Sequence, residues 1–310
     1  MSLSVLRLKN SAYFPTDFNQ RESTQLPLPY YFKTPPQAPC PLILITNTET
    51  YSQEILKIHE SNEIRLIIHP NSGYENFDVE LVKEMKIPFI LGNSIRAQAV
   101  AQYLIANFLS HFLRPHQKSW NRDFEQNKSS LVSKKEVLLF GHGHVGKLVE
   151  QQLKPLVQKL DIIDPYKKDC LTLKDVKIEN YDAILLACSL NEENKEFINA
   201  DFLQKLKDGC LIINPARGAL ISWEAIVNSP HLQFVLDVFP YEPFPIDKYC
   251  QNSNLKMTSH IAGCHSSLSE AILNFESHVI QDYLKLNFHE FLNKYEHQNL
   301  KNKIKGKHFL

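Results

Sequence analysis

The chain has 310 residues, which is enough for two ordinary domains, each with its own hydrophobic core. Its 34 basic residues balance 34 acidic ones, which argues against nucleic acid or an anionic membrane as the main partner. The sequence has neither a long apolar run nor a charged stretch followed by an apolar one at its start, so we expect no membrane span and no secretory leader. The six cysteines lack the spacings typical of zinc sites, which predicts no metal, reduced thiols and a cytoplasmic protein.

Apolar strands alternate with helices in the first part of the chain. Residues 4–8 could form a short strand, but the proline-rich stretch 26–41 reads as a surface excursion that partly replaces the first strand–helix unit. Strands are then predicted at residues 41–46, 64–69 and 88–91, and helices at residues 52–60 and 79–85. This alternation predicts an α/β fold in which helices cover the faces of a parallel sheet.

A second series of strands begins after a long helix at residues 95–114, whose apolar side chains cover more than one face. We expect this helix to be buried between domains or subunits. Strands follow at residues 136–140, 159–164, 183–188, 210–214, 233–238 and 255–259, and a helix at residues 270–285 ends the pattern. The sequence therefore predicts a Rossmann dinucleotide-binding domain (94–265) inserted in a smaller flavodoxin-like substrate domain (1–93 and 266–310), with the active site in the cleft between them.

A glycine-rich turn, Gly-His-Gly-His-Val-Gly (141–146), follows the strand at residues 136–140. Gly141 permits a tight turn, Gly143 lets the backbone approach a pyrophosphate, and Gly146 lets the next helix pack closely on the strand. The amino terminus of that helix offers unpaired N–H groups to the phosphates. A purely structural turn in an α/β sheet is the alternative, but the flanking strand, the helix and Asp164 favour a bound dinucleotide.

Asp164 ends the next strand and predicts which dinucleotide binds. A carboxylate there can accept hydrogen bonds from both ribose hydroxyls and repels a 2′-phosphate, which favours NAD (NADH) over NADP. Lys167 and Lys168 follow closely and could either neutralise a phosphate or form a solvated loop edge. The strictness of the preference for NAD therefore stays open.

Three further polar patches lie directly after strands of the second series. Arg217 has a planar guanidinium that suits bidentate capture of a carboxylate, although a salt bridge at a helix start is the alternative. Glu242 belongs to an acidic cluster after the strand at 233–238, and His260 ends the last strand. A lone histidine at a strand end is more often structural. Beside a carboxylate, however, the protonated imidazole is favoured and can act as a general acid toward a carbonyl oxygen.

Together these motifs resemble the D-isomer-specific 2-hydroxyacid dehydrogenase family over residues 42–285. The resemblance rests on the glycine turn with Asp164 and on three segments in the family's order and spacing, namely INPARGALI (213–221), LDVFPYEP (236–243) and TSHIAG (258–263). It implies that Arg217 binds the substrate carboxylate and carbonyl, that His260 is the proton donor and acceptor, and that Glu242 pairs with His260. Formate dehydrogenases, a related branch, carry Gln in place of Glu242, so this residue argues against them.

The resemblance also implies the remaining contacts. The turn with Ser72 and Gly73 matches the family's glycine turn, whose backbone N–H groups hold the substrate carboxylate, and Asp237 lies where the family keeps an aspartate near the nicotinamide. The residues expected to contact the cofactor are Gly141, Gly143, His144, Val145, Gly146, Asp164, Cys188, Ala216, Asp237 and His260. The family forms dimers through the cofactor domain, and the helix at 95–114 and Trp120 fit that use, so a homodimer is expected.

The chain departs from the family at positions that bear on the substrate. Arg96 and Gln102 stand where the family usually shows Asn and Glu, and Arg96 is either a second positive charge near the cleft or a surface residue at a helix start. The segment 187–191 lacks the family's Leu-Pro-Leu-Thr, so contacts beside the nicotinamide can differ. The sequence leaves open which 2-hydroxy acid is used and in which direction.

We therefore expect an NAD-dependent oxidoreductase that interconverts a 2-oxo acid and a D-2-hydroxy acid, with Arg217 and His260 supplying the charge that a metal would otherwise provide. The alternative is a dehydrogenase-like regulatory protein that senses NADH and turns over little substrate, since such a protein can keep the same residues. Assays with a panel of 2-oxo acids distinguish the two.

Overall fold

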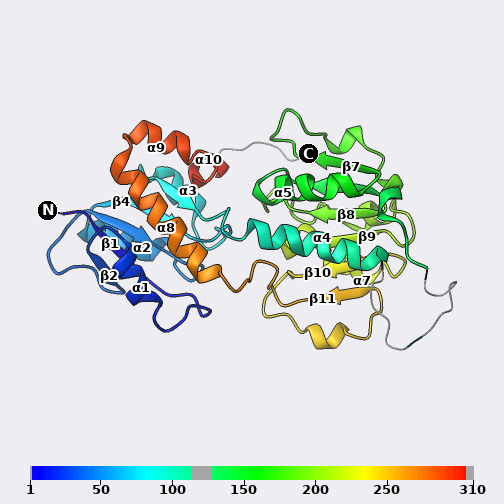
Figure 1. Cartoon of the computed structure of the whole chain (residues 1–310), viewed down its shortest axis with the longest axis horizontal. Coiled ribbons are helices and arrows are strands. Elements are labelled where there is room, and N and C mark those ends of the chain that lie inside the picture. The colour runs from blue at the N-terminus through cyan, green and yellow to red at the C-terminus, as the bar shows by residue number, and fades with distance from the viewer. Residues whose placement is uncertain (1, 114–119, 121–127, 305–310) are drawn as a thin grey trace. The chain divides into compact units, whose positions relative to one another are not determined.

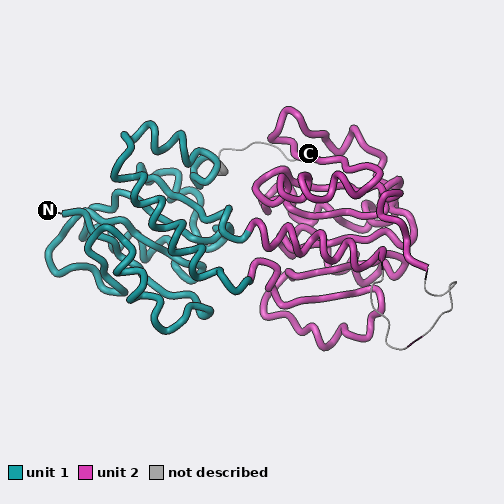
Figure 2. The backbone as a smooth tube through the Cα atoms, viewed as in Figure 1, with its two compact units in different colours: residues 1–96, 265–306 teal, residues 97–264, 307–310 magenta. Residues whose placement is uncertain are grey.

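The computed structural model describes residues 2–113, 120 and 128–304, and the chain divides into two compact units (Figure 2). Unit 1 comprises residues 1–96 and 265–306, and unit 2 comprises residues 97–264. Each unit has its own parallel sheet and its own hydrophobic core. The predicted α/β fold class is confirmed, and the chain leaves unit 1 and returns to it after unit 2 is complete.

Unit 1 is built on a sheet of five parallel strands in the order β2-β1-β3-β4-β5 (Figure 1). The strands are β1 (Ser4–Arg7), β2 (Tyr30–Phe32), β3 (Leu42–Ile45), β4 (Ile64–His69) and β5 (Phe89–Leu91). The central strands are apolar on both faces: Leu44 packs in one core cluster and Ile43 in another. The helices are α1 (Phe18–Gln25), α2 (Ser52–Ser61), α3 (Val79–Glu84), α8 (Leu268–Lys285), α9 (Phe288–Lys294) and α10 (Leu300–Ile304).

The first strand–helix unit is complete, so the prediction that it is cut down was wrong. Helix α1 follows β1, and β2 lies inside the proline-rich stretch, where it pairs with β1 between the two runs of prolines. Helix α1 has no apolar stripe, since only Phe18 and Glu22 are buried. Glu22 instead forms a fully buried ion pair with Arg7 on β1 at 2.7 Å, which a local pattern does not reveal.

Unit 2 is built on a sheet of six parallel strands in the order β11-β10-β9-β8-β6-β7 (Figure 1). The strands are β6 (Glu136–Phe140), β7 (Lys159–Ile163), β8 (Ala183–Leu186), β9 (Leu211–Asn214), β10 (Gln233–Leu236) and β11 (Leu255–Met257). The helices are α4 (Ala97–Leu113), α5 (His144–Leu153), α6 (Ala200–Leu203) and α7 (Trp223–Val227). All six strands run in one direction, so the loops that follow them gather at a single edge of the sheet.

Helix α4 buries only one face within this chain. Its buried residues recur every three or four positions and pack toward α5 and the sheet. Ile105 and Leu109 are partly covered, and Leu113 is 39% exposed. The predicted burial of this helix between domains or subunits stays a prediction. Among the helices of the described residues, none combines the length and the apolarity needed to cross a bilayer.

Candidate active site

The glycine turn between β6 and α5 has the geometry of a phosphate-binding loop. Gly141 has a φ of +98°, and a Cβ there would lie 2.7 Å from the Ala187 carbonyl. A Cβ on Gly146 would lie 2.0 Å from the Gly141 oxygen, which explains the third glycine. At Gly143 a Cβ would meet nothing within 4 Å, so the backbone faces open space there. Helix α5 begins directly afterwards without a side-chain cap, which leaves N–H groups for a pyrophosphate.

Asp164 lies directly after β7 and fastens the glycine turn. Its Oδ2 accepts from the His142 backbone N–H at 2.8 Å, and its Oδ1 accepts from that of Tyr166 at 3.1 Å. The residue is 9% exposed. A carboxylate offers about four lone-pair positions, so ribose hydroxyls can still be accommodated. The predicted ribose contact stays a prediction, but the loop-holding role was not anticipated.

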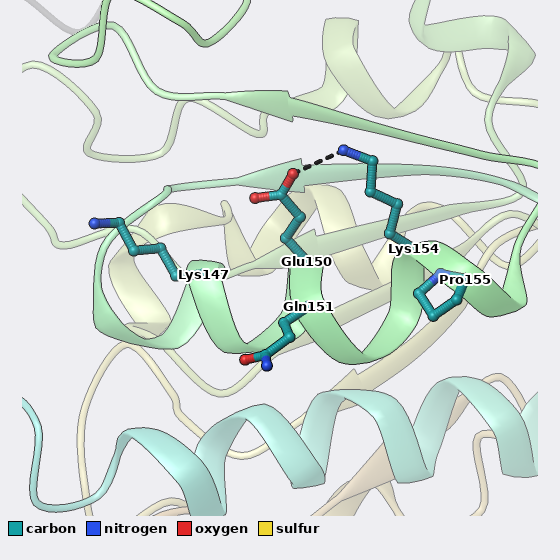
Figure 3. Close-up of a pocket in the computed structure, with 5 residues that line it drawn as sticks. All are labelled: Lys147, Glu150, Gln151, Lys154 and Pro155. Carbon is teal, nitrogen blue, oxygen red and sulfur yellow. Dashed lines mark hydrogen bonds and ion pairs between the residues drawn. The ribbon is translucent and has the colours of Figure 1, made fainter.

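A polar group around His142 has no counterpart in the sequence motifs. His142 Nε2 lies 2.8 Å from Glu150 Oε2, and His142 Nδ1 lies 3.5 Å from the Cys170 sulfur. Hydrogen bonds from Lys154 and His142 lower the pKa of Glu150. Glu150 and Lys154 also line a hollow on the surface of α5 together with Lys147, Gln151 and Pro155 (Figure 3). Lys147 points away from the Glu150–Lys154 ion pair. The hollow contains no predicted site residue, so we assign the hollow to the solvated face of the helix.

His260 and Glu242 form the contact that the resemblance implied. His260 Nδ1 lies 2.7 Å from Glu242 Oε2, and the two side chains are 53% and 38% exposed. His260 has a φ of +55°, which is unusual for a residue with a side chain, and its N–H donates to the Asp237 carbonyl at 2.7 Å. The backbone is thus bent at the residue predicted to transfer the proton, and Nε2 faces away from Glu242.

Asp237 supports this bend. Its side chain is fully buried after β10 and accepts from the Thr258 hydroxyl at 2.6 Å and from the N–H groups of Ile261 and Ala262, both at 2.8 Å. Three donors satisfy a buried carboxylate that would otherwise be costly. In the described structure Asp237 positions the loop that carries His260, while its predicted contact with the cofactor stays a prediction.

Glu242 is held from its other side. Its Oε1 accepts from the Phe239 N–H at 3.3 Å, and the Phe239 ring stacks on Phe244 with centroids 4.3 Å apart. Gly218, next to Arg217, approaches the same segment so closely that a Cβ would lie 2.0 Å from the Phe239 carbonyl. The glycine therefore lets the loops after β9 and β10 pack against each other.

Arg217 lies in a turn that Asn214 organises at the end of β9. The Asn214 side chain accepts from the Ala216 N–H at 3.0 Å and donates to the Arg217 carbonyl at 2.8 Å. Arg217 is half-buried, and its Nη1 donates to the Ala216 carbonyl at 2.6 Å. In the sequence, the Asn-Pro dipeptide at the start of this turn already indicates that Asn214 organises it.

The sheet of unit 2 therefore brings five predicted features to one edge. The glycine turn follows β6, Cys188 follows β8, Arg217 follows β9, Glu242 follows β10, and His260 follows β11. The Cys188 backbone lies against Gly141, and burial raises the pKa of its thiol to about 12, so the thiol stays neutral. Among the described residues, no group of three His, Cys, Asp or Glu side chains is placed to hold a metal ion.

The predicted substrate turn belongs to unit 1 and follows β4. His69, at the end of β4, donates through Nε2–H to the Gly73 carbonyl at 3.0 Å, and its Nδ1 lies 2.9 Å from the Thr46 hydroxyl. Burial lowers the pKa of His69 to about 3, with a smaller effect of the Arg96 charge in the same direction. A neutral histidine thus holds the turn through its contact with Gly73, while Ser72 is exposed. That this turn binds the same substrate as Arg217 stays a prediction.

Comparison with known proteins identifies the family of this chain. Residues 102–262 match the model of the D-isomer specific 2-hydroxyacid dehydrogenase NAD binding domain. The chain belongs to this family, and unit 2 holds its NAD-binding domain, which confirms the predicted family and the predicted cofactor.

Individual relatives are more distant. The chain is 29% identical over 233 residues to an erythronate-4-phosphate dehydrogenase of Wigglesworthia glossinidia brevipalpis, covering 71% of this chain and 57% of that protein. It is 28% identical over 224 residues to a hydroxypyruvate reductase of Thermotoga maritima, covering 66% and 72% of the two chains. The fold resembles that of a D-lactate dehydrogenase from Aquifex aeolicus complexed with NAD and lactic acid, with a TM-score of 0.72, 19% identity and coverage of 96% and 99%. The chain thus spans little more than half of the first of these curated relatives.

Proposed function

We propose that this protein is an NAD-dependent oxidoreductase that interconverts a 2-oxo acid and a D-2-hydroxy acid. The observation that carries the proposal is the His260–Glu242 pair at 2.7 Å on the sheet edge that also holds the glycine turn and Arg217. Because the cofactor supplies the hydride, side chains must transfer the proton and bind the substrate carboxylate. His260 is suited to the first task and Arg217 to the second.

The residues have distinct roles in this proposal. Arg217 binds the carboxylate of the substrate and polarises its carbonyl through charge-assisted hydrogen bonds, helped by the N–H groups of the Ser72–Gly73 turn. His260 gives the proton from Nε2 to the carbonyl oxygen during reduction and takes it back during oxidation. Glu242 stabilises the imidazolium that reduction consumes. Bound NADH supplies the hydride to the 2-carbon.

Cofactor binding in this proposal uses the residues around the glycine turn. The helix N–H groups at His144 and Val145 face the pyrophosphate, and Asp164 selects the unphosphorylated ribose. Cys188, Ala216 and Asp237 are the proposed neighbours of the nicotinamide. Asp237 would act there mainly through the loop that it holds, because its carboxylate is fully buried.

We further propose that the protein is a cytoplasmic homodimer. The apolar face of α4 supports a self-contact, because among the described residues Ile105 and Leu109 are only partly buried and Leu113 is 39% exposed. Trp120 is 88% exposed and was predicted to serve the same contact. Light scattering of the purified protein tests the assembly: a mass of one chain at micromolar concentration would contradict it.

A substrate panel tests the activity. NADH oxidation is measured with glyoxylate, pyruvate, hydroxypyruvate and longer 2-oxo acids, including the 2-oxo form of 4-phosphoerythronate that the name of one relative suggests. Turnover with at least one acid is expected, at a kcat/KM of about 10⁴ M⁻¹s⁻¹ or more for the best one. Tight binding of NADH without turnover of any acid would instead favour a regulatory protein that senses NADH.

A further inference from the structure

A cation without a carboxylate partner lies beside the Ser72–Gly73 turn of unit 1. Arg96 follows β5 and is half-buried, and its Nη1 donates to the carbonyl of Pro70 at 2.8 Å, two residues before Ser72. Its Nη2 donates to the Tyr13 hydroxyl, and the guanidinium carbon lies 5.6 Å from the centroid of the Tyr13 ring. Among the described residues no carboxylate forms an ion pair with Arg96, whereas Arg21 and Arg65 each pair with one carboxylate and Arg7 pairs with two.

Arg96 and Tyr13 lie at the edge of the sheet where ligands of α/β folds bind. Tyr13 belongs to the loop after β1, and Arg96 to the loop after β5. The same loop after β1 also reaches the end of β3, where Asn47 Nδ2 donates to the Asn10 carbonyl at 3.3 Å. The strand order β2-β1-β3-β4-β5 changes direction between β1 and β3, and open α/β sheets bind ligands at such a point, beyond the carboxyl ends of the strands.

Arg96 can offer both charge and hydrogen-bond donors to an anion. His69 beneath the turn is buried, and its pKa is lowered to about 3, so it adds no positive charge at neutral pH. The Arg96 guanidinium is permanently charged, and Pro70 and Tyr13 use only two of its five N–H donors.

We propose that Arg96, together with the Tyr13 hydroxyl, binds a second anionic group of the substrate. The acid used by this protein then carries a phosphate or a second carboxylate beyond its 2-carbon. The inference rests on the proposed function, because it takes the first carboxylate to lie at the Ser72–Gly73 turn. An arginine suits this task, since its planar fork of donors matches both phosphate and carboxylate.

Binding of matched acids tests the assignment without turnover. In the presence of NADH a 2-hydroxy acid cannot be oxidised, so its affinity is measured by calorimetry on the full chain. Glycerate is compared with 3-phosphoglycerate, erythronate with 4-phosphoerythronate, and 2-hydroxybutyrate with malate. The first two pairs differ by a phosphate and the third by a carboxylate, which separates the two sources of the charge.

Three variants accompany the wild-type protein. Arg96→Gln removes the charge, Arg96→Lys keeps the charge without the planar fork, and Tyr13→Phe removes one contact of the guanidinium. Arg65→Gln is the matched control, because Arg65 lies on β4 of the same unit, is 53% exposed and pairs with Glu63. Thermal unfolding of each variant reports whether the fold of unit 1 is kept.

The wild-type protein is expected to prefer the doubly charged member of at least one pair by about tenfold or more, since charged hydrogen bonds contribute about 1.5–3 kcal/mol. Arg96→Gln should abolish that preference, Arg96→Lys should reduce it, and Arg65→Gln should leave it intact. Equal affinities within all pairs for the wild-type protein would overturn the subsite and, if 2-oxo acids are reduced, leave the proposed function standing. A preference that survives Arg96→Gln, with only the melting temperature lowered, would show that Arg96 merely braces the loop after β1.

Discussion

His260 is fixed by contacts to both its side chain and its backbone. Glu242 lies 2.7 Å from Nδ1, and the Asp237 carbonyl accepts from the backbone N–H at 2.7 Å. The first contact sets which nitrogen faces away from the pair, and the second keeps the backbone at a φ of +55°. Because the two side chains are partly exposed, the effect of Glu242 on the imidazole is moderated by solvent.

Glu242→Gln keeps the shape of this pair and removes its charge. Proton transfer by His260 is expected to depend on the charge of Glu242, so Glu242→Gln should lower kcat/KM for reduction by about tenfold or more while NADH still binds. Glu224→Gln, an exposed position on α7, is the control and should leave kcat/KM unchanged. An undiminished kcat/KM in Glu242→Gln would show that the carboxylate does not govern the proton transfer.

Asp164 combines a predicted role in cofactor choice with an observed role in holding the glycine turn. Asp164→Ser should lower the ratio of kcat/KM for NADH over NADPH by about tenfold, because a charged contact and the repulsion of a 2′-phosphate are both lost. Asp164→Asn keeps one acceptor for the Tyr166 N–H and separates the loss of charge from the loss of loop structure. An unchanged ratio in both variants would mean that Asp164 does not face the ribose.

At the scale of elements, three parts of unit 1 are tied by one buried cluster. Arg7 on β1 contacts Glu22 on α1 at 2.7 Å and Glu276 on α8 at 2.5 Å, and all three side chains are fully buried. One guanidinium faces two carboxylates, so burial and the neighbouring Glu22 raise the pKa of Glu276 well above its ordinary value despite Arg7. The protonated form of Glu276 is therefore favoured more strongly in the folded protein than in the unfolded chain.

The sign of this effect on stability follows from the raised pKa. The contribution of Glu276 is fully present below the unfolded pKa of about 4.3 and is lost as pH rises toward the folded pKa. Glu276→Gln mimics the protonated acid, so the free energy of unfolding should fall less steeply with pH above about 4.3 than in the wild-type protein. Urea unfolding from pH 4.5 to 8 measures this, and an identical pH dependence would show that Glu276 is ionised in the fold.

His69 at the end of β4 gives the opposite dependence. Its folded pKa of about 3 is below the unfolded value of about 6.5, so stability is fully present above pH 6.5 and decreases as pH falls. The loss should approach about 1.4 kcal/mol per pH unit between pH 6 and pH 4. In His69→Gln the free energy of unfolding should fall less steeply as pH decreases, by the contribution of one proton, as measured by unfolding at several pH values. An unchanged slope would place the histidine in solvent.

The sequence predicted elements that local patterns specify and missed those that depend on distant partners. Strands such as β3, β4 and β9 are short apolar runs, and β6 with its glycine turn has a motif. Helix α1 has no such pattern, because its buried Glu22 is stabilised by Arg7, 15 residues away. Arg217, Glu242 and His260 were predicted as site residues from their motifs, and their roles stay predictions. The three donors to Asp237 lie 21–25 residues further along the chain, and His142 with Glu150 belongs to no motif, so these contacts needed the structure.

At the scale of the whole molecule, the two units carry complementary groups. The sheet of unit 2 ends in the glycine turn, Arg217 and the His260–Glu242 pair, to which we assign cofactor binding and proton transfer in the proposed function. The sheet of unit 1 ends in the Ser72–Gly73 turn beside Arg96, which suits binding of an anionic substrate. The central claim is that these groups serve a single reaction, the stereospecific reduction of a 2-oxo acid by NADH.

Transfer of deuterium tests this claim most directly. The full chain is incubated with NADH that carries deuterium at C4 of the nicotinamide and with the best acid of the panel, and the product is analysed by mass spectrometry and chiral chromatography. We expect one deuterium at C2 of a D-2-hydroxy acid and, for His260→Gln, a rate at least about a hundredfold lower with NADH still bound. An unlabelled product, an L-hydroxy acid or a His260→Gln variant of undiminished rate would contradict it.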